Sequence, residues 1–198
     1  MLRPVLTPRC RRGFHAPVPV HDDIEEVLYS AETIADQVRA LGGKLARDYA
    51  DKKPLVVGIL NGCFPFIADL VRSMDLALEV DFMAMSSYGA GTKSSGVVRT
   101  LKDLNQSIEG RHILLVEDII DTGLTLHYII ENLRTRQPAS LEVCALLDKV
   151  DARKVEVDVK YTGFRCPSKF VVGYGLDYAG VYRNLPYIGV LSPEVYGG

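Results

Sequence analysis

The apolar residues of the chain gather in short continuous runs, and segments with helical spacing lie between them. Four runs predict strands, at residues 54–60, 77–87, 111–118 and 141–149. Strands that are apolar on both faces are typical of parallel sheets, in which helices cover each face. Two further short strands are expected within residues 170–191, around a loop rich in glycine and tyrosine.

Helical spacing is clearest in residues 31–49, where apolar side chains recur at three- and four-residue steps after Ser30, a good N-cap residue. Gly42 and Gly43 are expected to weaken the middle of this helix, by about 1 kcal/mol each relative to alanine. Two more helices are predicted, at residues 64–74 and 125–136. Strands that alternate with helices predict an α/β fold with a doubly wound, mostly parallel sheet flanked by helices.

Polar clusters follow several of the predicted strands. They are Asn61-Gly62, Ser86-Ser87, residues 117–125 and Asp148-Lys149. Sheets of this kind bind ligands beyond the carboxyl ends of their strands, so we expect these clusters to meet at one binding edge. Beside it, the Gly- and Ser-rich residues 87–96 predict a mobile loop.

Composition favours an ordinary globular protein. With 198 residues, 47% hydrophobic and 24% charged, the chain suits one domain, which we expect to span residues 23–198. A net charge of −2 argues against nucleic acid as a partner, and no apolar run approaches the roughly 18 residues of a membrane helix. The four cysteines lack metal-type spacing and indicate reduced thiols in a cytoplasmic protein.

Residues 1–22 differ from the rest of the chain in composition. Up to residue 20 they include no acid and five basic residues, namely Arg3, Arg9, Arg11, Arg12 and the weakly basic His15. This composition is that of an organelle transit peptide, but prolines interrupt it and Thr7 is its one serine-like residue. We therefore favour a disordered basic extension or an upstream start codon over a transit peptide.

The stretch VEDIIDTGLTL carries the most specific chemistry of the chain. Gly123 allows a tight turn whose N–H groups, with two threonine hydroxyls and the N-terminus of the next helix, suit a phosphate. Alone, the DTG sequence is a weak signal that an Asx-turn capping a helix explains better than a phosphate site does. The adjacent acids Glu117 and Asp118, at the end of a buried strand, need a cation or hydroxyl partners. Together the two halves fit a phosphorylated ribose.

In its strand–turn–helix context this stretch resembles the phosphoribosyl-pyrophosphate (PRPP) motif of the type I phosphoribosyltransferases, in the form seen in hypoxanthine-guanine phosphoribosyltransferases. KFVVGYGLDYAGVYRNLPYIGVL is similar to the purine-binding tail of that family, and LNGCFPFIADL, SSYG and LLDK correspond in order to its other site segments. The resemblance covers residues 25–195. It implies the type I fold with a small purine-binding hood, and a Mg²⁺-dependent salvage enzyme that converts PRPP and hypoxanthine or guanine to IMP or GMP and pyrophosphate.

The resemblance also implies a role for each matching residue on the PRPP side. Asp121 resembles the general base or acid that handles the proton on purine N7. The 5-phosphate would be held by Asp121, Thr122, Gly123, Leu124 and Thr125. The ribose hydroxyls and Mg²⁺ would be held by Glu117 and Asp118, with Asp177 as a further metal ligand.

On the purine side, Lys149 resembles the cation that binds the 6-oxo oxygen and so selects hypoxanthine and guanine over adenine. Phe170 would stack on the purine and the main chain of Val171 would read its other edge, with Lys169 and Asp177 beside them. A solvated lysine and a core phenylalanine are the structural alternatives for Lys149 and Phe170.

Pyrophosphate would lie against Leu60, Asn61, Gly62, Ser87, Tyr88 and Arg183. Many relatives have lysine where Asn61 stands, in a loop that can adopt a non-proline cis peptide. Asn61 lacks that charge, so we expect main-chain binding from Gly62. Tyr88 would open a loop that closes over the site, or else pack on its own domain.

Two other functions stay open on these residues. One is a xanthine-using purine phosphoribosyltransferase, because nothing here identifies a reader of the 2-substituent. The other is a non-catalytic regulator that senses nucleotides and binds RNA, which the net charge of −2 disfavours. Family members are homodimers or homotetramers, so the resemblance implies one of these states.

Overall fold

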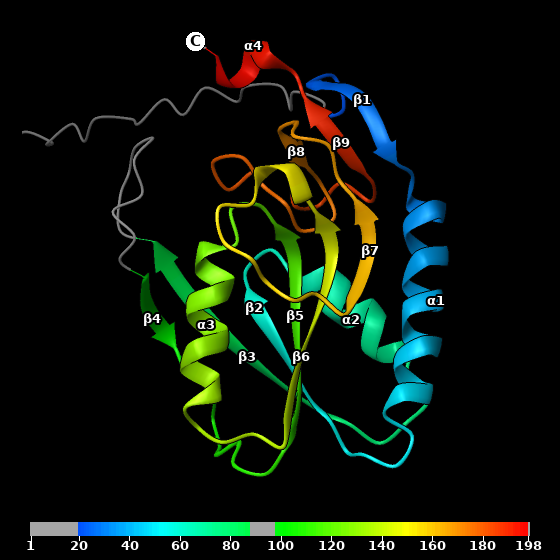
Figure 1. Ribbon diagram of the computed structural model, residues 1–198. Coiled ribbons are helices and arrows are strands. Elements are labelled where there is room, and N and C mark those ends of the chain that lie inside the picture. The colour runs from blue at the N-terminus through cyan, green and yellow to red at the C-terminus, as the bar shows by residue number, and fades with distance from the viewer. Residues whose placement is uncertain (1–19, 88–97, 198) are drawn as a thin grey trace, which may run out of the picture.

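The centre of the computed structural model, which describes residues 20–87 and 98–197, is a six-stranded sheet with the order β4-β3-β2-β5-β6-β7 (Figure 1). All neighbouring strands run parallel except β4, which pairs antiparallel with β3 at one edge. This sheet confirms the expected α/β fold. The strands are β2 (Leu55–Leu60), β3 (Glu79–Ser87), β4 (Val98–Lys102), β5 (His112–Ile120), β6 (Ser140–Asp148) and β7 (Tyr161–Arg165).

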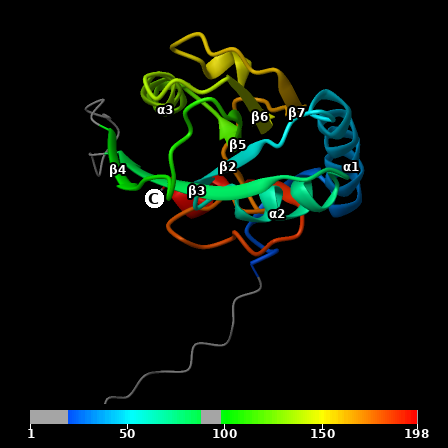
Figure 2. The same ribbon diagram turned by 90° about the horizontal axis from the view of Figure 1, so that it is seen from below.

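Helices cover both faces of the sheet (Figure 2). Because side chains alternate along a strand, β5 directs Leu114 and Val116 into one core and Ile113 and Leu115 into the other. The first core contains α1 and α2, and the second contains α3. These helices are α1 (Ala31–Asp48), α2 (Phe64–Arg72) and α3 (Leu124–Arg134).

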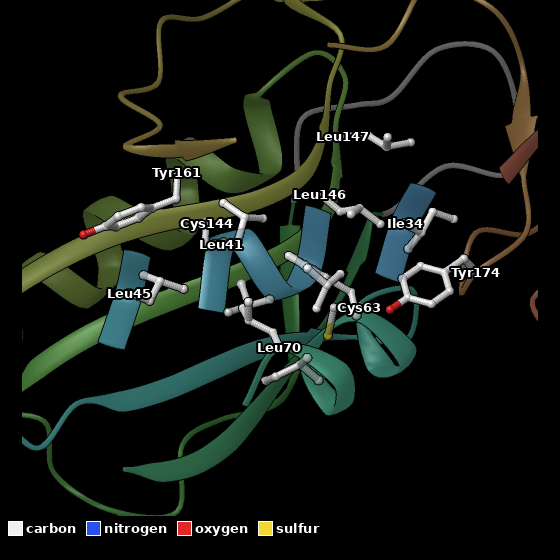
Figure 3. Packing of buried hydrophobic residues seen from close by; sticks show 14 of the residues in the cluster. Ile34, Leu41, Leu45, Cys63, Leu70, Cys144, Leu146, Leu147, Tyr161 and Tyr174 are labelled. Atoms are coloured by element: carbon white, nitrogen blue, oxygen red, sulfur yellow. The ribbon is translucent and has the colours of Figure 1, made fainter. Parts of the chain in front are cut away.

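Helix α1 begins as expected at Ser30, whose Oγ accepts a hydrogen bond from the N–H of Thr33 at 3.2 Å. Its apolar face packs on α2 and the sheet, and Figure 3 shows Leu41 and Leu45 among the side chains of this core. Gly42 lies where the two helices meet, since a Cβ there would stand 2.5 Å from the Cβ of Ser73, at the end of α2. The glycine therefore permits a close helix contact.

A second, three-stranded sheet lies beyond the carboxyl ends of the main sheet (Figure 1). Its order is β1-β9-β8, and both pairings are antiparallel. We call this sheet and the loop between β8 and β9 the hood. The remaining elements are β1 (Ile24–Tyr29), β8 (Val171–Val172), β9 (Ile188–Leu191), the 3-10 turn η1 (Val150–Ala152) and α4 (Pro193–Tyr196).

The sequence patterns predict the four central strands, the three long helices and the two C-terminal strands, but not β1, β4 or β7. These three strands lie at sheet edges, where burial on one face produces no continuous apolar run. The mobile loop expected at residues 87–96 lies, from residue 88 on, outside the described residues. The same holds for residues 1–19 of the basic extension. No helix among residues 20–87 and 98–197 is long and apolar enough to cross a membrane.

The glycine pair of α1 provides a test of this packing. In Gly42→Ala the new methyl group would overlap Ser73, so we expect the free energy of unfolding to fall by about 1–3 kcal/mol. In Gly43→Ala, the matched control, the nearest atom is a flexible Arg47 Nη1 at 3.7 Å. That variant should instead gain about 0.5–1 kcal/mol from helix propensity. Urea unfolding measures both, and two changes of the same sign would contradict the close contact.

Candidate active site

The site lies where the winding of the sheet reverses, between β2 and β5. Strand β2 is followed by α2 and β3 on one side, whereas β5 is followed by α3 and β6 on the other. The pairing of β2 with β5 ends at Gly58 and Val116, but β5 stays paired with β6 as far as Ile120. Strands β2 and β5 therefore separate beneath the hood and leave a crevice, as neighbouring strands of parallel sheets do at such a switch point.

Two adjacent acids occupy this crevice. Glu117 is 8% exposed, and burial, followed by the charge of Asp118, raises the pKa of Glu117 well above its usual value. Burial also raises the pKa of Asp118, although the N–H of Ile119 and the charge of Arg183 act in the opposite direction. Among the described residues neither acid forms an ion pair, so together they suit a divalent cation or the hydroxyls of a ligand.

The loop after β2 presses against these acids. A Cβ on Gly62 would stand 1.6 Å from Asp118 Oδ2, so any larger residue here would displace the Asp118 carboxylate. On its other side, a Cβ on Gly175 of the hood would stand 2.0 Å from the carbonyl oxygen of Gly62. The Leu60–Asn61 peptide bond is cis, and the Asn61 side chain is exposed. The main chain of this loop is thus clamped between Asp118 and the hood.

The turn after β5 begins α3 with an open N-terminus. Gly123 is the N-cap, with φ 78°, and a Cβ there would stand 3.2 Å from the carbonyl oxygen of Val155. The turn borders a concavity of about 240 Å³, lined by Glu117, Ile119, Ile120, Asp121, Thr122, Gly123, Thr125 and Leu126. Leu124 is 39% exposed and does not line this concavity. Free N–H groups, hydroxyls and the helix N-terminus make the concavity suitable for an anion.

A second concavity, also of about 240 Å³, adjoins the first and shares Ile119 and Asp121 with it. Lys149 Nζ lies 3.5 Å from Asp121 Oδ2, and the lysine side chain is 12% exposed. Asp121 therefore stands between the turn that begins α3 and a partly apolar space. The other lining residues are Asp118, Phe170, Val171, Leu176 and Asp177.

Phe170 forms one wall of the second concavity and is 39% exposed. Tyr196 of α4 stacks on it, with ring centroids 5.0 Å apart and an interplanar angle of 27°. Lys169 behaves differently from its neighbour, because its ammonium pairs with Glu26 of β1 at 2.5 Å. It borders a third concavity, next to Tyr196, and not the one that contains Val171.

Asp177 and Arg183 form an ion pair of 2.7 Å at the hood side of the crevice. Asp177 also accepts the N–H of Gly180, and Arg183 donates to the carbonyl oxygen of Gly175 at 2.6 Å. Within the described part of the chain, no three His, Cys, Asp or Glu side chains gather in a ready-made metal cluster. A cation here would thus need oxygen atoms from a ligand as well as from Glu117 and Asp118.

The fold thus brings most of the predicted site residues to one crevice, although their roles stay predictions. Lys169 is turned toward β1. Ser87 ends β3, where its main chain pairs with Val98, and Tyr88 lies outside the described residues. Ile119, Leu176 and Tyr196 were not predicted as site residues, because apolar and aromatic residues near a motif carry no chemical signal of their own.

Comparisons with known proteins agree with this arrangement. Residues 26–179 match the family model described as phosphoribosyl transferase domain. The hypoxanthine-guanine phosphoribosyltransferase of Bacillus subtilis is 54% identical over 174 residues, which cover 88% of this chain and 97% of that protein. The bifunctional protein TilS/HprT of Listeria monocytogenes is 51% identical over 95% of this chain, which spans 29% of that longer protein. The crystal structure of a Staphylococcus aureus hypoxanthine phosphoribosyltransferase, 47% identical, superposes with a TM-score of 0.88 over 93% of this chain and 100% of that one.

The buried acid pair predicts a pH dependence of stability. Because the unfolded chain releases the Glu117 proton at lower pH than the folded protein, the stability from this residue is present below pH 4.5 and is lost as the pH rises. Glu117→Gln should therefore be more stable than the parent at pH 7 and lose less stability between pH 4.5 and 7. Urea unfolding with a chelator present measures this difference. Glu109→Gln, at an exposed acid, is the control, and equal pH profiles for all three proteins would refute the argument.

Proposed function

The chain belongs to the hypoxanthine-guanine phosphoribosyltransferase family, and we propose that it transfers the 5-phosphoribosyl group of PRPP to N9 of hypoxanthine or guanine. The bond between C1′ and the pyrophosphate oxygen breaks, the bond from C1′ to N9 forms, and IMP or GMP leaves with pyrophosphate. One observation carries the proposal. A turn suited to an anion and a partly apolar concavity meet at Asp121, as the two halves of a nucleoside monophosphate require.

For the 5-phosphate, we propose the turn from Asp121 to Thr125. The αL conformation of Gly123 lets consecutive N–H groups face the first concavity, and the N-terminus of α3 adds its partial positive charge. The hydroxyls of Thr122 and Thr125, both at this concavity, supply further donors. Phosphate binding here needs no lysine, and none lines the concavity.

Glu117 and Asp118 would bind the ribose hydroxyls and share Mg²⁺ with the substrate. Two adjacent carboxylates without a cationic partner in the described residues fit this hard cation, which favours one or two protein carboxylates plus phosphate oxygens. When bound, Mg²⁺ supplies positive charge to the departing pyrophosphate. Asp177 could join them only by exchanging its ion pair with Arg183.

Asp121 would accept the proton of purine N7 as the new bond forms. It borders both concavities, which suits a group between the ribose and the base. Lys149 Nζ, 3.5 Å from Asp121 Oδ2, places a positive charge beside this carboxylate. The carboxylate would also stabilise the positive charge that develops on the ribose in the transition state.

The second concavity would hold the purine. Phe170 offers a ring face, Ile119 and Leu176 offer apolar contacts, and Lys149 can donate to a 6-oxo oxygen. The 6-amino group of adenine would present donors to this donor, so the site favours 6-oxopurines. Relatives named for hypoxanthine and guanine give no support to the xanthine-using or regulatory alternatives.

The pyrophosphate would lie at the loop Leu60–Gly62, with Arg183 opposite. Asn61 offers no charge, so binding would rest on main-chain N–H groups and on Arg183, which would leave Asp177. The sequence resemblance adds Ser87 and Tyr88 to the residues that would bind pyrophosphate.

We further propose that the protein is a homodimer or homotetramer in the cytoplasm. Sedimentation tests the oligomeric state, and cell fractionation tests the compartment. Mass analysis of the mature N-terminus examines whether residues 1–22 are retained.

A panel of four purines is the direct test of this function. With PRPP and Mg²⁺, hypoxanthine and guanine should release pyrophosphate, whereas adenine should show a kcat/KM about 10⁴-fold lower because it presents donors to Lys149. Xanthine turnover would widen the range of accepted 6-oxopurines. Failure of all four bases to release pyrophosphate would overturn the enzyme assignment and favour the nucleotide-sensing regulator.

The role of Asp121 can be tested separately. Asp121→Asn keeps the shape but cannot accept the proton, so kcat should fall by about 10²–10⁴-fold while PRPP still binds. Steady-state kinetics with hypoxanthine and equilibrium binding of PRPP measure the two effects. Asp151→Asn, at a nearby exposed acid, is the matched control. A kcat for Asp121→Asn close to that of the control would remove Asp121 from proton transfer.

A further inference from the structure

One arginine holds the segment that follows β6. Arg153 donates from Nε and Nη2 to the two carboxylate oxygens of Asp148, at 3.1 and 2.8 Å, and from Nη1 to the carbonyl oxygen of Val157 at 2.7 Å. The side chains of Arg153 and Asp148 are 17% and 9% exposed. A planar guanidinium that spans a carboxylate and a main-chain carbonyl fixes both ends of this segment at once. We call this arrangement the Arg153 clasp.

Lys149 directly follows the clasped aspartate. Its N–H donates to the carbonyl oxygen of Ile120 at 2.9 Å, and the carbonyl oxygen of Asp148 accepts the N–H of Cys166 at 2.9 Å. Among the described residues, the one polar partner of the Lys149 ammonium is Asp121. The direction of this side chain is therefore set by the main chain on which it stands.

The other end of the segment touches the anion-binding turn. The N–H of Lys154 donates to the carbonyl oxygen of Thr122 at 2.9 Å. Val155 and Val157 lie so close to Gly123 that a Cβ there would stand 3.2–3.3 Å from their atoms. One short segment thus lines the second concavity through Lys149 and packs against the turn of the first through Lys154, Val155 and Val157, and Arg153 lies between these two parts.

We propose that Arg153 is a positioning residue that sets the place of the Lys149 ammonium in the purine concavity. The inference rests on the proposed function, because it takes Lys149 as the group that binds the 6-oxo oxygen. Arg153 lines neither the anion-binding concavity nor the purine concavity and acts through Asp148. A clasp that served folding alone would leave purine affinity unchanged in a folded variant.

The first variant is Arg153→Lys, which keeps a positive charge beside Asp148 but cannot form the planar fork together with the Val157 bond. The KM for hypoxanthine should rise about tenfold, since small displacements of a contact group are costly. The KM for PRPP should change less, because the main-chain bond between Lys154 and Thr122 remains. Thermal unfolding checks that the variant is folded.

A matched control exists at the opposite end of α3. Arg136 also donates from both Nη atoms to one carboxylate, that of Asp103, at 2.8 and 2.9 Å. Arg136→Lys makes the same chemical change away from the crevice and should leave both KM values unchanged. The double variant Asp148→Asn with Arg153→Met removes both partners, so that no uncompensated charge is buried, and should reproduce the rise in hypoxanthine KM.

The outcomes separate this inference from the proposed function. An unchanged hypoxanthine KM in both folded Arg153 variants overturns it, and so does an equal rise of the hypoxanthine and PRPP KM values. Lys149→Ala, measured with hypoxanthine and adenine, provides the reference. If it leaves the preference for hypoxanthine intact, the proposed role of Lys149 itself fails. If it raises the hypoxanthine KM while Arg153→Lys does not, the positioning role of Arg153 alone fails.

Discussion

The site of this protein depends on the reversal of winding between β2 and β5. Neighbouring parallel strands that continue to opposite sides must part at their carboxyl ends, and here the pairing stops at Gly58 and Val116. The gap is where the sheet can expose polar groups without losing ladder hydrogen bonds. The acids after Val116 and the loop after Leu60 both project into it. Every other part of the site is arranged around this opening.

The charged groups around the opening differ in sign according to the part of the substrate that each would bind in the proposed function. Glu117 and Asp118 are buried side by side at a cost in desolvation, which a cation or hydroxyl groups can offset. The turn after β5, next to them, offers main-chain dipoles and hydroxyls in place of lysine, as the proposed phosphate site requires. The positive side chains Lys149 and Arg183 each already lie beside a carboxylate, that of Asp121 and that of Asp177. In the proposed function, the acids and the anion-binding groups coexist because they would face different groups of one substrate.

Local sequence patterns predicted the central strands of the main sheet well and the edge strands poorly. Strands covered on both faces must be apolar throughout, so β2 and β5 were visible as runs, and the Ser30 cap marked the start of α1. Strand β1, with the sequence IEEVLY, is exposed on one side and is held by pairing with β9, about 160 positions further along the chain. Gly42 likewise looked like a weakness of α1. A glycine is needed there because the helix approaches Ser73 closely, and the sequence around Gly42 does not reveal that contact.

By itself the sequence determined the type of sheet, the position of the proposed phosphate turn and the chemical identity of the proposed site groups, because these depend on residue type and short-range spacing. The tertiary structure alone decided their mutual placement. It set Lys149 opposite Asp121, turned Lys169 toward Glu26, and placed Arg153 against Asp148 and Val157. These contacts depend on how β6, the hood and the segment after β6 pack together. Packing directions of that kind are a property of the whole folded chain and are not encoded in any short stretch of it.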